Sequence, residues 1–380
     1  MKAIVNGVVY TPYRVISPGT IVIDGREILL VGSGDAVNIP EDVEIIDAES
    51  RAVVPGFIDV HMHGAMGHDA MGPELADVIR RLPEFGVTGF VGTTLTLPKD
   101  ETFAGLEAMA EVLASPPAGA RCLGIHLEGP FLSPEEPGMA TAEWFEPFNW
   151  ERFQQLQELA GGHIRMLTFA PEEGEGLEAI PRLQKAGVIP VVGHSDATFE
   201  QIAEAVDLGL NHATHTFNAM PAFHHRRPGV VGAVMYFQQI VAELIADGVH
   251  IHPAVMAILL RIKGLDRVAL VSDSSPLAGL PEGEYEWEHK SIYVKDGACR
   301  LEDGTIAGAH ALLDTGVRNL VKMVGLPLEE ALVPATRVPA DVLGVRKGRL
   351  LPGYDADIVL LDDGYNAVLT LAEGEIVHRA

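Results

Sequence analysis

Eight apolar segments, each followed by polar residues and then by a helical pattern, constrain the fold of this chain more than any other feature. In chain order they read AVVPGFIDVHMHG, GVTGFVGTTLT, RCLGIHLEGP, IRMLTFAPE, GVIPVVGHSDA, NHATHTFNAM, QIVAELIADGVHIH and DRVALVSDSS. Between them lie amphipathic segments that close near a glycine, such as TFAGLEAMAEVLAS and TFEQIAEAVDLG. Near-continuous apolar strands that alternate with helices are typical of parallel sheets covered on both faces. Eight such units predict an α/β fold with a closed (β/α)8 TIM barrel.

The two ends of the chain differ from this middle part. The first segments alternate in polarity, and the dipeptides Asn6-Gly7 and Asp24-Gly25 are typical of hairpin turns. The last segment, GRLLPGYDADIVLLDDGYNAVLTLAEGEIVHRA, has the same β-rich character. Because chain termini often lie close together, we expect both ends to form one small β-sandwich domain. The predicted domains are residues 1–51 with 345–380 for the sandwich and 52–344 for the barrel.

The charge of the chain excludes some partners. It has 27 Lys and Arg against 53 Asp and Glu, a formal net charge of −26, and such a field repels nucleic-acid phosphates and anionic lipid surfaces. The apolar run AVMAILL is too short to span a bilayer. The chain has two cysteines, and its start, MKAIVNGVVYTPYR, lacks the pattern of a signal peptide. We therefore expect a cytoplasmic protein without a nucleic-acid or membrane partner.

Side chains that can bind metals stand where the predicted barrel strands end. In the first strand, alternate residues would point to the same side about 6–7 Å apart, a workable spacing for two ligands of one ion. Since the carboxyl ends of all barrel strands share one rim, we expect these side chains to converge on one mixed nitrogen and oxygen site. Such a site suits Zn²⁺, Fe²⁺, Mn²⁺ or Co²⁺. In chain order the residues are His61, His63, Glu128, His194, His215 and Asp273.

Several motifs resemble those of a known family. The runs PGFIDVHMHG, HLEGPF, GHSDAT, THTFNAMP, IADGVHIH and VSDSSPLAG, with the tail GRLLPGYDADIVLLD, look like the amidohydrolase superfamily and, more narrowly, the N-acetylglucosamine-6-phosphate deacetylases. HLEGP and NAMP are the more discriminating pieces. The resemblance covers essentially the whole chain in the right order. It implies a metal-dependent deacetylase that converts N-acetylglucosamine-6-phosphate to glucosamine-6-phosphate and acetate, and it implies a homodimer.

The resemblance also implies roles for the residues at the rim. Glu128, His194 and His215 match the primary metal ligands of the family, and Asp273 matches its catalytic carboxylate. Some members lack the His-x-His pair and use one ion, whereas this chain keeps it. We therefore predict one or two ions per subunit, with zinc as the first choice. One ion would lie on His61, His63, Glu128 and Asp273, and the other on Glu128, His194 and His215. A metal-bound hydroxide would be the nucleophile, and Asp273 would act as general base and then as general acid.

Substrate-binding residues follow from the same resemblance. Arg226 matches the phosphate-binding arginine of the family. An arginine suits this role, because a planar guanidinium pairs well with phosphate oxygens. Asn218 and Ala219 match a loop that holds the same phosphate. His250 matches a histidine that contacts the substrate.

Two segments depart from the family pattern. Ala140, in SPEEPGMATAEW, stands about where the family carries a histidine that assists at the substrate. A second ion or another histidine would have to replace this donor. The segment AGAHALLD gives Ala309, His310 and Ala311 in place of the usual Gly-Ser-rich lining, and His310 is one candidate for the replacement donor.

Two other functions stay open at this point. The first is an amidohydrolase acting on another N-acetylated amino sugar, such as the galactosamine isomer, or on another amide. The second is a binding protein that keeps the barrel and its metal without turnover. Asp273 argues against the second, because a purely structural site closes its coordination and needs no spare carboxylate.

Overall fold

The barrel predicted from the eight apolar segments is present in the computed structural model, which describes residues 1–34 and 36–380. Eight parallel strands follow one another around it in sequence order. Backbone hydrogen bonds at the ends of the first and the last of these strands close the barrel. The amide of Asp273 donates to the carbonyl of His61 over 2.9 Å, and the amide of His63 donates to the carbonyl of Ser274 over 2.8 Å. The strands are β6 (Phe57–Met62), β9 (Val87–Thr93), β10 (Arg121–Glu128), β11 (Ile164–Phe169), β12 (Ile189–Val192), β13 (His212–Ala213), β14 (Val241–Ile245) and β15 (Val268–Val271).

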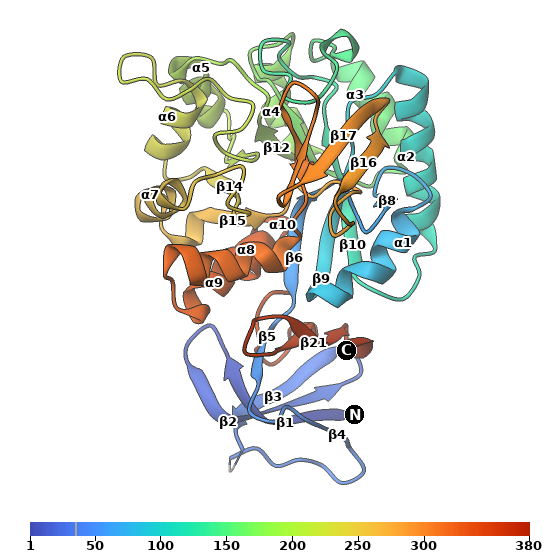
Figure 1. Ribbon diagram of the computed structural model, residues 1–380, viewed down its shortest axis with the longest axis vertical. Helices are drawn as coiled ribbons and strands as arrows, with labels where there is room; N and C mark the ends of the chain where they lie inside the picture. Colours follow the sequence, from blue (N-terminus) through green and yellow to red (C-terminus); the bar gives the residue numbers. More distant parts are fainter. Residues whose placement is uncertain (35) are drawn as a thin grey trace.

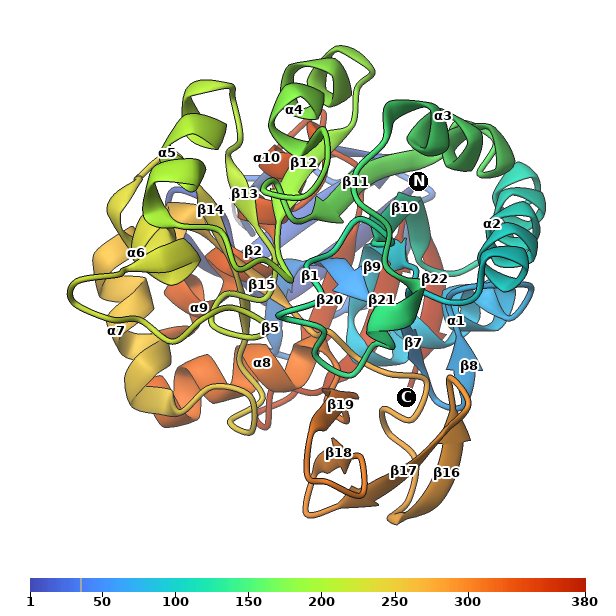
Figure 2. The ribbon, with the colours of Figure 1, turned by 90° about the horizontal axis from the view of Figure 1, so that it is seen from above.

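Helices surround the strands as a ring, which Figure 2 shows from above. They are α1 (Leu75–Arg81), α2 (Lys99–Ala114), α3 (Trp150–Leu159), α4 (Gly176–Lys185), α5 (Phe199–Asp207), α6 (Gly229–Tyr236), α7 (Pro253–Lys263), α8 (Leu313–Asn319), α9 (Leu328–Ala335) and α10 (Arg337–Leu343). Within residues 1–34 and 36–380, no helix is both long and apolar enough to cross a membrane.

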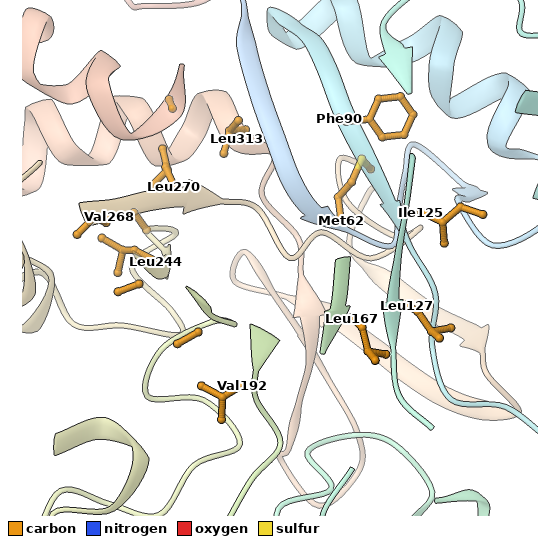
Figure 3. Close-up of a cluster of buried hydrophobic side chains, with 14 of the residues drawn as sticks. Met62, Phe90, Ile125, Leu127, Leu167, Val192, Leu244, Val268, Leu270 and Leu313 are labelled. Carbon is orange, nitrogen blue, oxygen red and sulfur yellow. The ribbon is translucent and has the colours of Figure 1, made fainter. Parts of the chain in front are cut away.

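The apolar strands are buried on both faces, which explains their continuous hydrophobicity. Side chains such as Phe90, Leu127 and Leu270 pack outward against the helices in one large cluster, part of which Figure 3 shows. A second cluster, which includes Ile58 and Val191, draws on side chains from other positions of the barrel strands and on α10. Burying both faces in this way stabilises the scaffold that carries the rim.

The two ends of the chain form a separate sheet below the barrel in Figure 1, and both termini lie in it. The expected β domain built from both termini is therefore confirmed. The exact boundaries at residues 51 and 345 stay predictions, and Asp35 lies outside the described residues. The strands are β1 (Lys2–Tyr10), β2 (Val15–Asp24), β3 (Glu27–Ser33), β4 (Glu44–Asp47), β5 (Ala52–Pro55), β20 (Ile358–Leu361), β21 (Ala367–Ala372) and β22 (Glu375–Arg379).

One of the two turns expected in this domain is wrong. Gly25 does lie in the turn that joins β2 to β3, but Asn6 and Gly7 lie inside β1. There the pairing of β1 with β2 shifts register, and Asn6 has a left-handed backbone with φ of 58°. A left-handed Asn serves a β-bulge as well as a hairpin turn, so the dipeptide alone does not distinguish the two.

The chain also forms a four-stranded antiparallel sheet that the sequence did not predict. It is inserted between β15 and α8, and Figure 2 shows it at the edge of the ring of helices. A two-stranded pair, β7 (Gly64–Ala65) with β8 (His68–Asp69), follows the first barrel strand. The inserted strands are β16 (Gly283–Trp287), β17 (Lys290–Lys295), β18 (Ala298–Arg300) and β19 (Ile306–Ala309).

Candidate metal centre

The structure brings all six predicted metal-capable side chains together at the carboxyl ends of the barrel strands. Glu128 is the last residue of β10, and His194, His215 and Asp273 each stand two residues beyond the end of a strand. All six residues are buried, with Asp273 the most exposed at 9 %. The rim position follows from the common direction of the parallel strands.

Glu128 lies at the centre of the cluster. Its Oε1 is 3.4 Å from His61 Nε2, 3.3 Å from His194 Nε2 and 3.2 Å from His215 Nε2. Its other oxygen, Oε2, is 3.4 Å from His63 Nε2. Each carboxylate oxygen therefore faces histidine nitrogens, so Glu128 is able to bind two ions at once.

Asp273 closes the cluster on the side of the His-x-His pair. Its Oδ1 lies 3.1 Å from His63 Nε2 and 3.5 Å from His61 Nε2. On the opposite side, His194 Nε2 and His215 Nε2 are 3.0 Å apart. The candidate ligands thus form two groups that share Glu128, and His61, which lies with His63 and Asp273, is also close to His215.

These residues fit a divalent ion. Two ligands of a tetrahedral ion at 2.0–2.1 Å are about 3.3 Å apart, which matches the distances between the side chains. His61 Nε2 and Glu128 Oε1 are buried and make no hydrogen bond to any described residue. Buried polar atoms are almost always partnered, and a divalent ion between these atoms would partner both.

Electrostatics keep the carboxylates of the site ionised. Burial acts to raise the pKa of Glu128, but His61, His194 and His215 outweigh it and hold that pKa well below its usual value. Burial likewise acts to raise the pKa of Asp273, and His61 and His63 overcome this and lower it to about 2. At neutral pH both side chains are therefore able to bind a cation, and Asp273 is able to accept a proton.

A second layer of groups orients the histidines. The ring nitrogen Nδ1 of His194 lies 2.9 Å from the carbonyl oxygen of Glu136, to which it donates. His61 Nδ1 lies 2.9 Å from the carboxylate of Glu243 on β14. Outer partners of this kind set the tautomer and the ring orientation of histidines that bind metals.

A cavity of about 350 Å³ opens beside the cluster. Its polar floor contains Glu128, His215 and Asp273, and its apolar wall includes Leu95 and Trp287. The cavity places an apolar surface next to a cluster able to activate water, which is the arrangement needed to hydrolyse a bond of a partly apolar substrate.

Four of the predicted substrate-binding positions line this cavity: Ala140, Asn218, Ala219 and His250. His250 Nδ1 is 2.7 Å from Asp247 Oδ2, which fixes the ring. Burial acts to lower the pKa of His250, but Asp247 outweighs it and raises that pKa.

Two predicted substrate-binding residues lie elsewhere. Arg226 is exposed and lines a different cavity with Phe199 and Pro228. His310 Nε2 lies 2.8 Å from the carbonyl oxygen of Leu280, away from the cavity lining.

Sequence reasoning missed two residues of the site. Glu243 is a fully buried carboxylate in the apolar strand VAELI; because a buried charge is costly unless it is partnered, its position in the sequence was a usable signal. Trp287 lies in the inserted sheet, and its Nε1 donates to Asp69 Oδ2 over 2.9 Å. No local pattern indicated that this segment covers the rim.

Comparison with known proteins gives consistent results along the chain. Residues 52–377 match the model of the amidohydrolase family. The N-acetylglucosamine-6-phosphate deacetylase of Bacillus subtilis is 35% identical over 376 residues, which are 97% of this chain and 95% of the relative. The N-acetylgalactosamine-6-phosphate deacetylase of Escherichia coli O157:H7 is 32% identical over 360 residues, which are 93% of this chain and 95% of that protein.

Among solved structures, a mutant N-acetylglucosamine-6-phosphate deacetylase of Mycobacterium smegmatis, in complex with N-acetylglucosamine-6-phosphate, is similar throughout. It has a TM-score of 0.91 and 30% sequence identity, and the match covers 99% of each chain. The similarity therefore extends over the barrel, the inserted sheet and the terminal sheet.

Proposed function

Since the chain belongs to the amidohydrolase family, we propose that it hydrolyses the N-acetyl group of N-acetylglucosamine-6-phosphate to give glucosamine-6-phosphate and acetate. The observation that carries this proposal is the convergence of four histidines and two carboxylates on one cavity. Nearly full-length similarity to deacetylases of phosphorylated amino sugars supports the choice of substrate. The chain is an enzyme, and the reading as a binding protein without turnover is not favoured.

The proposed ligand sets follow the two groups of side chains around Glu128. Glu128, His194 and His215 would hold one ion, and His61, His63, Glu128 and Asp273 would hold the other. A divalent ion bound there would lower the pKa of a water molecule and polarise the acetyl carbonyl. We propose Zn²⁺ as the resident ion, because imidazole and carboxylate ligands suit it.

Asp273 is the proposed general base and acid. Its low pKa leaves the carboxylate free to take a proton from the attacking water. As the new C–O bond forms and the C–N bond breaks, Asp273 returns this proton to the amine nitrogen. Without that second transfer the nitrogen would leave as an unstable anion.

Side chains of the cavity are proposed to hold the sugar phosphate. His250, held by Asp247 with a raised pKa, suits a negatively charged group, and Asn218 with the backbone of Ala219 lies at the same cavity. Arg226 is exposed, so its contact with the phosphate requires that its loop moves or that a second subunit presents it. The proposed homodimer is compatible with the second route.

Ala140 at the cavity has no donor for the substrate. His310 is turned to the carbonyl of Leu280, so we propose that the ion at His61 and His63 takes over the polarisation of the carbonyl. The cytoplasmic location stays a prediction.

The test is the rate of deacetylation by protein reconstituted with Zn²⁺. Three substrates are compared: N-acetylglucosamine-6-phosphate, the same sugar without phosphate, and N-acetylgalactosamine-6-phosphate. We expect rapid turnover of the first, a drop of at least a hundredfold in kcat/KM without the phosphate, corresponding to about 2.8 kcal/mol, and slower turnover of the galactosamine isomer. Arg226→Ala tests the phosphate contact of the exposed loop.

Each contrary outcome has a distinct meaning. Equal rates with and without phosphate would reject the phosphorylated substrate. A preference for the galactosamine isomer would move the assignment to the activity of the Escherichia coli relative. No turnover of any of the three, with metal bound, would reject the proposed function.

A further inference from the structure

Glu243 is a buried carboxylate that the proposed reaction does not use. It is 0 % exposed, in the middle of β14, where the other four residues are apolar or small. Within the described residues, its ion-pair partners are two histidines and no Lys or Arg. A carboxylate in such a place is strongly destabilising unless hydrogen bonds compensate it, so its contacts indicate its role.

Both oxygens of Glu243 are occupied. Oε1 lies 2.9 Å from His212 Nε2. Oε2 lies 2.9 Å from His61 Nδ1, 2.9 Å from Thr214 Oγ1 and 3.1 Å from the amide nitrogen of His215. An ionised carboxylate only accepts hydrogen bonds, so all four partners donate to it.

These contacts determine which nitrogen of His61 carries the proton. Thr214 Oγ1 is also 2.8 Å from His61 Nδ1, but the hydroxyl proton of Thr214 is directed to Glu243. Its oxygen can therefore only accept from His61, which again requires a proton on Nδ1. A neutral imidazole with its proton on Nδ1 keeps its lone pair on Nε2, and this is the nitrogen that faces Glu128 and Asp273.

Two other histidines among the proposed ligands lack such a partner. His63 Nδ1 and His215 Nδ1 are buried and make no hydrogen bond to the described part of the chain. His126, whose ring lies 4.8 Å from that of His61, does not compete for Glu243. Its two ring nitrogens are within 3.0 Å of Val60 O and 2.7 Å of Thr168 Oγ1. Within the described residues, His61 is therefore the one proposed ligand whose side chain contacts Glu243, and His215 reaches it through its backbone amide.

We propose that Glu243 is a positioning residue that holds His61 in the tautomer with Nε2 free, and so sets the affinity of the ion at His61 and His63. The inference rests on the proposed two-ion centre but not on the substrate. Loss of an outer partner of this kind weakens metal binding by about 10–100-fold. The ring of His194 has a different outer partner, the carbonyl of Glu136, so we expect the ion at His194 and His215 to lose less affinity than the ion at His61 and His63.

The experiment measures Zn²⁺ per subunit in the full-length protein, by mass spectrometry after equilibration with graded chelator. Glu243→Gln replaces one carboxylate oxygen by an NH2 group, which donates hydrogen bonds. An NH2 group that faces His61 disfavours a proton on Nδ1. We expect the variant to lose one ion at a chelator concentration about 10–100-fold lower than the wild type requires, while the second ion is retained. Thr214→Val is the matched control, because it removes the contacts of the Thr214 hydroxyl with Glu243 and with His61 Nδ1 and leaves the contact of Glu243 with His61.

A second measurement observes the tautomer directly. In metal-free protein labelled with ¹⁵N-histidine, the His61 signals are identified by their absence in His61→Gln, and we expect the proton on Nδ1. An Nδ1 that carries no proton would overturn the proposal, even where Glu243→Gln does not fold. Unchanged affinity for both ions, or an equal loss of both, would also overturn it. None of these measurements uses a substrate, so an inactive deacetylase would leave the inference intact.

Discussion

Four residues of the cavity have a left-handed backbone although none of them is glycine. The φ angles are 48° for His194, 83° for Phe217, 47° for Ala219 and 49° for Asp273. Each such residue costs about 1–3 kcal/mol and persists only where its surroundings hold it. Asp273 is held by two backbone hydrogen bonds, one to His61 over 2.9 Å and one from Ala309 over 2.7 Å. At these four positions the packing around the cavity holds the backbone in a conformation that the residue type does not favour.

At Asp273, replacement by Asn removes the proton acceptor and keeps the shape. We expect kcat to fall by about 10²–10⁴-fold, the usual contribution of general acid and base catalysis, while the ion at Glu128, His194 and His215 is retained. Steady-state kinetics with metal analysis of the same sample check this. A kcat within tenfold of the wild type would contradict the proposed role.

Two histidines near the site are expected to differ in importance. His250 lines the cavity, whereas His310 is bonded to Leu280. Replacing His250 by Ala removes a hydrogen bond to a charged group, worth about 1.5–3 kcal/mol, and should raise KM for the phosphorylated substrate at least tenfold. His310→Ala should leave kcat/KM within about twofold of the wild type, which corresponds to a change of at most about 0.4 kcal/mol. The opposite order of effects would make His310 the missing donor.

At the scale of elements, the inserted sheet is held to the rim by polar contacts. Trp287 donates to Asp69, His289 Nε2 lies 3.0 Å from Glu101 Oε2, and the Lys290 ammonium donates to the carbonyl of Met139. Met139 and Ala140 belong to the segment that departs from the family pattern. The inserted sheet therefore supplies Trp287 to the cavity wall and also positions this segment.

Glu288 makes the stability of the inserted sheet depend on pH. Burial raises its pKa to about 8, and the carboxylates of Asp69 and Glu101 add to the effect. The folded state thus binds this proton more tightly than the unfolded chain, whose reference value is 4.5. The stability that this tighter proton binding gives to the folded state is fully present below pH 4.5 and is lost as the pH rises through about 8.

Glu288→Gln cannot ionise, so its Tm should match the wild type near pH 5 and exceed it near pH 9. Because this side chain is partly exposed, we expect the variant to be more stable than the wild type at pH 9 by only ~1 kcal/mol. This corresponds to a Tm higher by about 2 °C for a chain of this size. Thermal unfolding across this pH range tests it, with Glu286→Gln on the exposed face of β16 as control. Parallel curves for Glu288→Gln and the wild type would reject the explanation.

For the whole molecule, a buried charge network joins the two ends of the chain. The Lys347 ammonium, 2 % exposed, lies 3.0 Å from Asp355, 2.8 Å from Asp357 and 3.3 Å from Glu373. Arg26, in the turn between β2 and β3, is 2.9 Å from Asp355. The network thus connects the amino-terminal strands to the carboxyl-terminal ones.

Lys347→Ala leaves buried carboxylates without their main partner. Breaking a buried pair from one side costs about 3–5 kcal/mol, and we expect a loss of this size in the free energy of unfolding. Lys2→Ala is the control, because its ion pair with Glu375 at 3.2 Å is largely exposed on the acid side and is worth less than about 1 kcal/mol. Chemical denaturation measures both, and equal losses would contradict the role of the network.

Local patterns in the sequence were sufficient to predict the barrel and the positions of its rim residues. Eight apolar strands that alternate with helices predict a parallel barrel because each strand needs cover on both faces. Once that fold is accepted, the ends of the strands meet at one rim, so His61, Glu128 and Asp273 converge although long stretches of chain separate them. The inserted sheet was not predictable in this way. Its first hairpin turns at Glu288 and His289, both with positive φ, without the Asn-Gly or Asp-Gly signal that usually marks such a turn.

Contacts between distant residues were decided only by the tertiary structure. Strict alternation puts Phe57 and His61 on the same face of β6, yet Phe57 packs toward the helices while His61 faces the site. The pairing of β6 with β9 shifts register between Phe57 and Ile58 and again between Asp59 and Met62, so strict alternation does not hold along β6. The bond of His61 to Glu243 joins residues 182 positions apart, and the exposed position of Arg226 depends on how its loop packs. The sequence by itself determined which side chains stand at the rim, because the end of each apolar strand can be located from a local pattern. Their orientation and outer partners depend on packing between strands, which no local pattern contains.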